Sequence, residues 1–174
     1  VEGYLVTNGT RAMAVKDAVN FAKKNGVKIA ISLSDPFVVN LFGDTLREVI
    51  DDGVDLIFGN KAEVLAFSNT LNIESAVKIL KRYTKTFVIT DGANGAITFD
   101  GIALNHSKGV EARAIDTNGA GDMFAGAFLF AITEGKDYQG AANFANYCAA
   151  RVVEQFGPRL NGNVFADIKS RFND

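Results

Sequence analysis

The chain has 174 residues, of which 48% are apolar, and 18 basic and 20 acidic side chains give a formal net charge of −2. This composition predicts one globular domain, residues 1–174, and the scattered charges and short apolar runs predict neither a nucleic-acid-binding surface nor a membrane protein. A single cysteine and no signal-peptide pattern favour a soluble, cytoplasmic protein, and an apolar run at the first residue indicates a fragment.

The first half of the chain alternates predicted strands with predicted helices. Apolar runs predict strands at Gly3–Thr7, Val27–Leu33, Val54–Phe58 and Thr86–Thr90. Apolar residues at helical spacing predict helices at Arg11–Lys24, in two short stretches within Val38–Asp52, at Lys61–Ser68 and at Ile73–Tyr83. This alternation predicts an α/β fold with a mainly parallel sheet and helices on its faces.

The second half begins with a predicted hairpin and ends in helices. Asp100 and Gly101 form a turn-favouring pair between the short apolar segments Ala96–Phe99 and Ile102–Leu104, which predicts an antiparallel extension of the sheet. The closing helices are predicted at Gly119–Glu134, Tyr138–Gln155 and Val164–Phe172.

A cluster of special residues lies where a polar loop enters the first of these closing helices. Its members are Asp116, Thr117, Asn118, Gly119, Ala120, Gly121 and Asp122. The glycines let the backbone approach a ligand closely, and the free amides of a first helical turn attract anions such as phosphate. Asp122 could accept the proton of an attacking hydroxyl, or it could simply complement the helix dipole. The residues alone leave both interpretations open.

These seven residues resemble the signature of the ribokinase, or PfkB-type, family of carbohydrate and nucleoside kinases. Two further segments follow the family's motifs in the family's order: Asn60–Glu63 resembles Asn-x-x-Glu, and Thr90–Gly95 resembles Thr-x-Gly-x-x-Gly. Taken singly, Glu63 also fits a solvated helix residue, and the glycine segment also fits a plain turn. The resemblance covers essentially the whole chain, but only the C-terminal part of a family member.

The resemblance implies a three-layer α/β/α ribokinase-like fold whose N-terminal part and lid are missing, and it implies that ATP and magnesium are the cofactors. In the family, the residue matching Asp122 is the catalytic base, the amides around Gly119, Ala120 and Gly121 form an anion hole, and the residue matching Glu63 holds magnesium through water. The nucleotide contacts that it implies are Ser34, Asn60, Thr90, Gly92, Gly95, Asn146, Ala150 and Val153.

Three of these assignments carry open alternatives. Asp35 stands where many family members have an asparagine that touches phosphate, so Ser34 is the expected donor and Asp35 would face magnesium or solvent. Asn146 matches the position beside the adenine ring, yet it also fits a polar residue in an Ala-rich core helix. Asp116 and the carbonyl of Asn118 resemble a monovalent cation site, which would hold potassium.

The predicted activity is ATP-dependent phosphoryl transfer to a primary hydroxyl of adenosine or a related nucleoside or sugar. One alternative is a ribokinase- or fructokinase-type sugar kinase, and another is a non-catalytic nucleotide-binding regulatory module. A generic dinucleotide-binding domain is set aside, because Asn8, Gly9 and Thr10 stand where its glycine fingerprint would begin. Without the missing N-terminal half, which is the expected partner of this part, the chain is expected to be inactive or weakly active.

Overall fold

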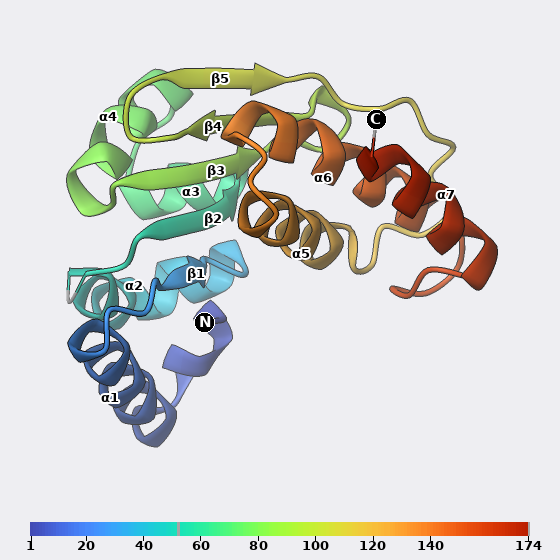
Figure 1. Cartoon of the computed structure of the whole chain (residues 1–174). Helices are drawn as coiled ribbons and strands as arrows, with labels where there is room; N and C mark the ends of the chain where they lie inside the picture. Colours follow the sequence, from blue (N-terminus) through green and yellow to red (C-terminus); the bar gives the residue numbers. More distant parts are fainter. Residues whose placement is uncertain (52, 174) are drawn as a thin grey trace. The chain divides into compact units, whose positions relative to one another are not determined.

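The computed structural model describes residues 1–51 and 53–173, and the chain divides into two compact units. The first unit comprises Val1–Ile89 with Asp100–Ile102, and the second comprises Thr90–Phe99 and the residues from Ala103 onward. Figure 1 shows the helices and strands in chain order. Within the described ranges, every helix is too short or too polar to cross a membrane.

Strands and helices alternate throughout the first unit, as predicted. Its elements are η1 (Gly3–Thr7), α1 (Gly9–Lys24), β1 (Ala30–Ser32), α2 (Pro36–Asp51), β2 (Leu56–Asn60), α3 (Lys61–Ser68), α4 (Ile73–Tyr83) and β3 (Thr86–Thr90). Strands β1 and β2 pair in parallel, with Ile31 opposite Ile57, and β3 is the next strand in the sheet order. Both isoleucines are fully buried, so these strands form the core of this unit.

The first predicted strand is wrong, because Gly3–Thr7 is a 3₁₀ helix. Only the preceding residue, Glu2, forms a bridge, in parallel with Ser32. The chain then turns, and the amide of Leu5 donates to the carbonyl of Glu2 at 3.0 Å. Val6 is buried at 2% exposure, whereas Tyr4 and Leu5 are exposed at 51% and 39%, so the predicted burial holds for only part of this run. A short apolar run fixes no backbone conformation by itself, since strands and short helices can bury the same residues.

Helix α2 confirms the two predicted helical stretches. It bends at Phe42, whose φ of −123° and ψ of 19° lie outside the helical range. Val38 and Val39 are buried before the bend, and Leu46 is buried after it. The last residue of the second predicted stretch, Asp52, lies outside the described residues.

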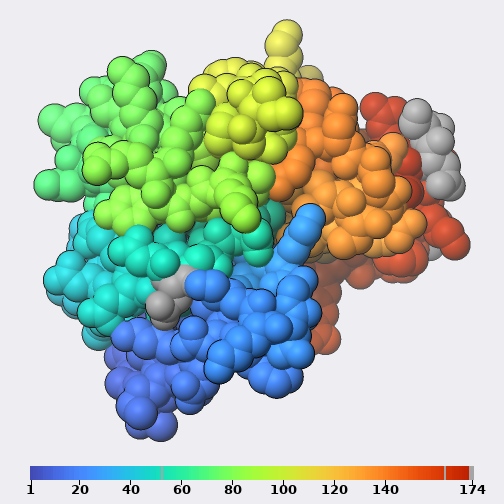
Figure 2. Space-filling model, turned by 60° about the vertical axis from the view of Figure 1, so that its left-hand side comes forward, coloured from blue at the N-terminus to red at the C-terminus, as the bar shows by residue number. Residues whose placement is uncertain are grey.

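Helix α1 lies at one end of the first unit, where Figure 2 shows it in dark blue. The Asn8 side chain caps the helix by accepting a hydrogen bond from the amide of Thr10 at 3.0 Å. Val15 and Val19 are buried on one face, whereas Met13 and Phe21 are each more than two-thirds exposed. The helix therefore buries only a narrow apolar stripe.

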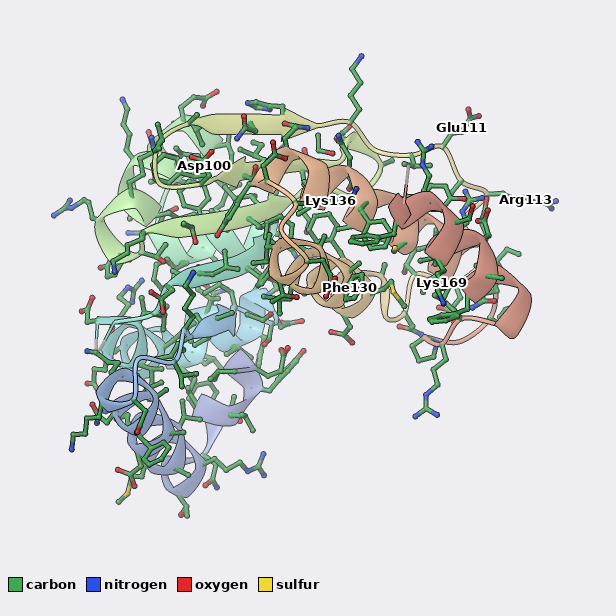
Figure 3. All side chains as sticks on the ribbon, in the orientation of Figure 1. Asp100, Glu111, Arg113, Phe130, Lys136 and Lys169 are labelled. Atoms are coloured by element: carbon green, nitrogen blue, oxygen red, sulfur yellow. The ribbon has the colours of Figure 1, made fainter. Side chains whose placement is uncertain are left out.

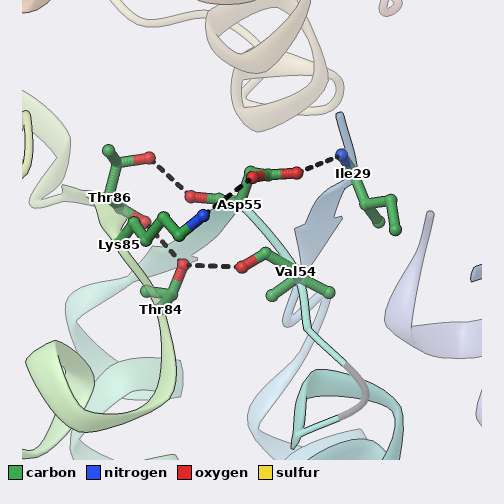
Figure 4. Close-up of polar contacts among 6 residues, drawn as sticks. All are labelled: Ile29, Val54, Asp55, Thr84, Lys85 and Thr86. Carbon is green, nitrogen blue, oxygen red and sulfur yellow. Dashed lines mark hydrogen bonds and ion pairs between the residues drawn. The ribbon is translucent and has the colours of Figure 1, made fainter. Parts of the chain in front are cut away.

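Asp55, just before β2, joins the segments that enter the strands of the first unit (Figure 4). Its carboxylate accepts a hydrogen bond from the amide of Ile29 at 2.9 Å. Its own carbonyl accepts bonds from the amide of Thr86 at 3.2 Å and from the Thr86 hydroxyl at 2.7 Å. Lys85 places its ammonium group 4.0 Å from the same carboxylate. Asp55 therefore links the segments that lead into β1 and β3 to the segment that leads into β2.

The second unit contains a hairpin and three long helices. Its elements are η2 (Gly92–Asn94), β4 (Ala96–Phe99), β5 (Leu104–Ser107), α5 (Ala120–Thr133), α6 (Tyr138–Val153) and α7 (Gly162–Asn173). Strands β4 and β5 are antiparallel, which confirms the predicted hairpin, but the two-residue turn is wrong because Phe99 pairs with Leu104. The Asp100 carboxylate accepts the amide of Ile102 at 2.8 Å, and this local bond widens the turn to four residues.

Small and aromatic side chains both contribute to the packing of the helices in the second unit. Ala131 and Ala145 are fully buried, one on α5 and one on α6, and their size allows close helix packing. Phe128 on α5 packs against Tyr138 on α6 with ring centroids 5.2 Å apart. Phe130, labelled in Figure 3, lies 4.8 Å from the ring of Phe172 on α7. Aromatic contacts from the C-terminal half of α5 thus join it to both α6 and α7.

The bond from the amide of Ile29 to Asp55 predicts a measurable loss of stability on truncation. In Asp55→Ala this buried donor loses its acceptor, and we expect the free energy of unfolding to fall by about 1–3 kcal/mol in urea titrations. Asp55→Asn retains an acceptor and should lose less than half as much. Equal losses in the two variants would show that the charge, and not the hydrogen bond, matters.

Candidate functional site

The predicted anion site lies at a sharp turn before α5, in the second unit. Gly119 adopts the left-handed conformation, with φ of 79° and ψ of 0°. A Cβ atom at this position would lie 2.5 Å from the Cβ of Pro158, so both the backbone angle and the available space require glycine. A glycine at the cap has no side chain to satisfy the first helical amides, and the first bond of α5 runs from the amide of Met123 to the carbonyl of Gly119. Of the amides before Met123, that of Ala120 donates to the carbonyl of Thr117 at 3.3 Å. The amides of Gly121 and Asp122, in the first turn of the helix, are suited to bind an anion.

Asp122 lies in the first turn of α5, three residues after the cap, and its side chain is exposed. Gly121 before it is also exposed and leaves open space where a side chain would project. A carboxylate here can meet a ligand bound at the amides, and it also complements the positive end of the helix dipole. The geometry is compatible with both roles that the sequence left open for Asp122.

Asp116 fastens the loop before α5 to the segment that follows α6. One carboxylate oxygen accepts the amide of Asn118 at 3.0 Å, and the other accepts the amide of Gly157 at 3.0 Å. These bonds favour the ionised form and hold the pKa of Asp116 below its ordinary value. The amides of Ile115 and Asp116 also donate to the carbonyl of Val153. In this structure the Asp116 carboxylate acts as an anchor for the turn.

The predicted phosphate loop is pressed against the segment after β5. The amide of Asp91 donates to the carbonyl of Gly95 at 2.8 Å, which closes the loop. A Cβ at Gly95 would lie 2.0 Å from the carbonyl oxygen of Ser107, and one at Gly109 would lie 2.0 Å from that of Ala93. Gly109 is thus as necessary to the loop as Gly95 is. Sequence analysis missed it, although a glycine shortly after a hairpin was a usable signal.

A cavity of about 710 Å³ adjoins both the phosphate loop and the start of α5. Eight of the predicted site residues line it: Thr90, Gly92, Gly95, Ala120, Gly121, Asn146, Ala150 and Val153. Lining residues that the sequence did not indicate include Val110, Ala112, Ala114 and Ala149. Pockets for small molecules commonly enclose about 300–1,000 Å³, so this cavity has the size for a nucleotide.

The segment between β5 and α5 forms one wall of this cavity. Figure 3 labels Glu111 and Arg113 on it, with their side chains directed outward from the ribbon. The amide of Arg113 donates to the carboxylate of Glu154 at 3.4 Å. Between the charged positions, Val110, Ala112 and Ala114 contribute small apolar groups to the lining. Glu111 lines the cavity as well, so this wall is mostly apolar toward the cavity and carries one acidic residue there.

The first unit holds the predicted magnesium residue, Glu63, in a capping box at the start of α3. The Asn60 side chain accepts the amide of Glu63 at 2.9 Å, and the Glu63 carboxylate accepts the amide of Asn60 at 2.8 Å. The second carboxylate oxygen accepts the Asn60 side-chain amide. Glu63 is only 6% exposed, so its interpretation as a solvated helix residue is wrong. The Asn-x-x-Glu motif has a structural role of its own, because it starts this helix.

The environment of Glu63 opposes its ionisation. Burial raises the pKa of its carboxyl first, and the negative charges of Asp35 and Glu2 raise it further, while the bonds from Asn60 act in the opposite direction. A cation near this carboxylate would relieve the penalty. Among the described residues there is no group of three or more acidic, histidine or cysteine side chains that could by itself hold a metal ion. The carboxylate therefore fits a magnesium ion that takes most of its ligands from water and phosphate.

Ser34 occupies a strained position close to these carboxylates. Its φ of 69° is unusual for a residue other than glycine. The hydroxyl accepts the amide of Gly3 at 2.7 Å and donates to the carboxylate of Glu2 at 2.8 Å. Asp35 next to it accepts the amide of Phe37 at 2.6 Å. Ser34 would have to exchange its bond to Glu2 for one to phosphate in order to act as the predicted donor.

The second unit places a glycine turn at a helix N-terminus beside a mostly apolar cavity, an arrangement that is suited to a phosphorylated ligand. The family model described as pfkB family carbohydrate kinase matches residues 1–163. This chain therefore belongs to the pfkB family of carbohydrate kinases, and the resemblance seen in the sequence is confirmed.

Named relatives include both sugar and nucleoside kinases. The ribokinase of Lactococcus lactis is 29% identical over 154 residues, covering 88% of this chain and 48% of the relative. The adenosine kinase of Saccharomyces cerevisiae is 28% identical over 155 residues, covering 79% of this chain and 44% of the relative. The chain spans about half the length of the curated relatives that it matches.

Solved structures confirm the fold. The adenosine kinase of Sinorhizobium meliloti is 30% identical and superimposes with a TM-score of 0.91, covering 98% of this chain and 53% of that one. An E. coli protein described as ribokinase II, in complex with ATP and Mg²⁺, is 25% identical, with a TM-score of 0.85, covering 98% of this chain and 57% of that one. The predicted ribokinase-like α/β fold, mainly parallel with an antiparallel hairpin, is thereby confirmed.

The left-handed turn at Gly119 predicts a large cost for any side chain there. We expect Gly119→Ala to lower the free energy of unfolding by about 1–3 kcal/mol from backbone strain alone, with a further loss from the overlap with Pro158. The control is Gly126→Ala in the same helix, which meets nothing within 4 Å and should stabilise α5 by up to about 1 kcal/mol. Chemical unfolding measures the free energy of unfolding of both variants. Equal changes in the two variants would contradict the assigned turn.

The raised pKa of Glu63 predicts how stability depends on pH. As pH rises above the ordinary glutamate value of 4.5, the unfolded chain loses this proton before the folded chain does. This carboxyl therefore makes the folded state less stable as pH rises, up to the raised folded-state pKa, and its contribution is constant above that. Urea unfolding across this range should show a less negative slope for Glu63→Gln than for the unaltered chain. Identical slopes would contradict the burial effect.

Proposed function

We propose that this chain is the ATP-binding and catalytic part of a kinase that transfers the γ-phosphoryl group of ATP to a primary hydroxyl of adenosine or a related nucleoside or sugar. In this proposal residues 1–174 act together as one part of a longer enzyme. The observation that carries it is the start of α5, where Ala120 and Gly121 line the 710 Å³ cavity and the exposed Asp122 follows directly. Family membership and the relatives' names support the class of reaction.

The cavity would hold the nucleotide. Val110, Ala149, Ala150 and Val153 offer an apolar surface suited to a purine ring. Thr90 and the loop glycines, Gly92 and Gly95, would meet the phosphates through hydroxyl and amide groups that no bulky side chain obstructs. A relative that covers 98% of this chain was solved with ATP and Mg²⁺, which supports this choice of cofactors.

The amides at the start of α5 would form the anion hole of the reaction. They are fixed by the turn at Gly119 and by the Asp116 anchor, so they need no reorganisation when charge develops on the transferring group. Asp122 would accept the proton of the attacking hydroxyl, which increases the nucleophilicity of its oxygen. Magnesium, held through water by Glu63, would neutralise charge on the phosphates. Potassium near Asp116 and Asn118 would further shape the anion hole.

The acceptor is proposed at the level of a class. Similarity to adenosine kinases favours a nucleoside, and similarity of the same extent to a ribokinase favours ribose or another sugar. Both acceptors present a primary hydroxyl, which is all that the proposed base requires. Parallel assays of the longer protein with adenosine, ribose and fructose would separate them.

Replacement of the base provides the direct test. In the longer protein, Asp122→Asn should lower kcat by about 100- to 10,000-fold, because general-base help of this size is lost, while the Kd for ATP changes little. Asp17→Asn on α1, an exposed carboxylate elsewhere, serves as the matched control. Steady-state kinetics and calorimetry measure both quantities.

Full activity of Asp122→Asn would contradict the assignment of the base. ATP binding without any phosphoryl transfer by the unaltered longer protein would instead favour a nucleotide-binding regulatory module. Absence of ATP binding would contradict the nucleotide site itself.

A further inference from the structure

A chain of hydrogen bonds links α6 to the segment that follows β5. The side-chain amide nitrogen of Asn146 donates to the hydroxyl of Ser107 at 2.7 Å and to the carbonyl of Lys108 at 3.2 Å. The Ser107 hydroxyl donates in turn to the side-chain carbonyl of Asn143 at 2.7 Å. Asn146 is 7% exposed and Ser107 is 4% exposed, so loss of these bonds would leave buried polar groups unpaired.

The donors and acceptors in this chain can be assigned without ambiguity. A side-chain amide has two N–H hydrogens, and Asn146 gives one to Ser107 and one to Lys108. The Asn143 carbonyl accepts both from Ser107 and from Gln139, whose amide nitrogen lies 3.2 Å away. Asn146 therefore has no N–H left for the ring nitrogens of a nucleobase, although it lines the cavity.

The segment held by Asn146 supports the phosphate loop. The carbonyl of Ser107 faces Gly95 so closely that a Cβ there would lie 2.0 Å from it, and Gly109 approaches Ala93 with the same closeness. Any movement of the backbone between Ser107 and Gly109 must therefore displace the loop or open a gap against it. The next residue, Val110, lines the cavity, so the same segment also forms its wall.

We propose that Asn146 is a positioning residue: it fixes the Ser107–Val110 wall, and through it the Gly92–Gly95 loop, and its N–H groups do not select the nucleobase. This inference rests on the proposed binding of a nucleotide in the cavity. A loosened wall weakens contacts to the base and to the phosphates alike. Loss of the Asn146 side chain should therefore reduce the affinity for all purine nucleotides by one common factor. A residue that reads the base would change their ratio.

The test compares the affinities of ADP and GDP for the unaltered chain and for Asn146→Ala by calorimetry. Both affinities should fall by about 10-fold, the equivalent of one lost hydrogen bond, with their ratio unchanged within about twofold. Ser107→Ala should reproduce the effect. Because this change removes only one hydroxyl, it can replace Asn146→Ala in the test if Asn146→Ala folds poorly. The double variant should bind hardly more weakly than Asn146→Ala alone, since both changes break the same chain of bonds.

The matched control is Cys148→Ala, in the same helix. This thiol is 1% exposed and does not line the cavity, so its loss should reduce stability and leave both affinities unchanged. A weakening as large as that in Asn146→Ala would show that general destabilisation of α6 explains the result, and would overturn the proposal. A change in the ADP to GDP ratio in Asn146→Ala alone would assign base reading to Asn146 instead.

Amide hydrogen exchange tests the mechanical step without any nucleotide. In Asn146→Ala the amides of residues 107–110 and 92–95 should exchange faster than in the unaltered chain, and unchanged exchange there would overturn the proposal. If the unaltered chain binds neither ADP nor GDP, the proposed function fails, and the exchange data still decide whether Asn146 holds the wall. The two failures are thus distinguishable.

Discussion

The candidate nucleotide site depends on the close approach of backbone segments, which is possible only where glycine has no Cβ atom. Gly95 and Gly109 let the phosphate loop and the segment after β5 approach so closely that a methyl group on either would overlap a carbonyl oxygen. Gly119 likewise leaves no room for a side chain, here against the Cβ of Pro158, and it turns the chain into α5. These contacts determine where the walls of the cavity lie. They also allow little local adjustment, which is a useful property in a site that must present amides in fixed directions.

The polar side chains of the motifs mostly bind their own chain. Asn60 and Glu63 satisfy one another at the start of α3, and Asp116 holds one amide in the loop before α5 and one in the segment after α6. Asn146 donates to the wall of the cavity. In the second unit, recognition of an anion therefore falls to main-chain amides, which the side chains hold in position. This division explains how a site with little charge of its own can serve a highly charged ligand.

Much of the fold followed from the sequence because its signals were local. Helical spacing predicted α3 and α4 with their observed bounds, and the alternation predicted the parallel strands. The predictions failed at two segments. Gly3–Thr7 is helical, although its apolar run suited a strand, and the hairpin turn is longer than its two favoured residues implied. In the site, motif residues were found by resemblance, whereas Gly109 and Val110 line or support the cavity only because the chain folds back there.

The central claim is that the amides at the start of α5 and in the phosphate loop bind the phosphates of a nucleotide. An NMR titration of the ¹⁵N-labelled chain with a non-hydrolysable ATP analogue and Mg²⁺ tests it most directly, since each backbone amide reports separately. The account predicts saturable shifts at the amides of Gly95, Ala120, Gly121 and Asp122, and much smaller ones on α1. Shifts confined to other parts of the chain, or none at saturating nucleotide, would contradict it.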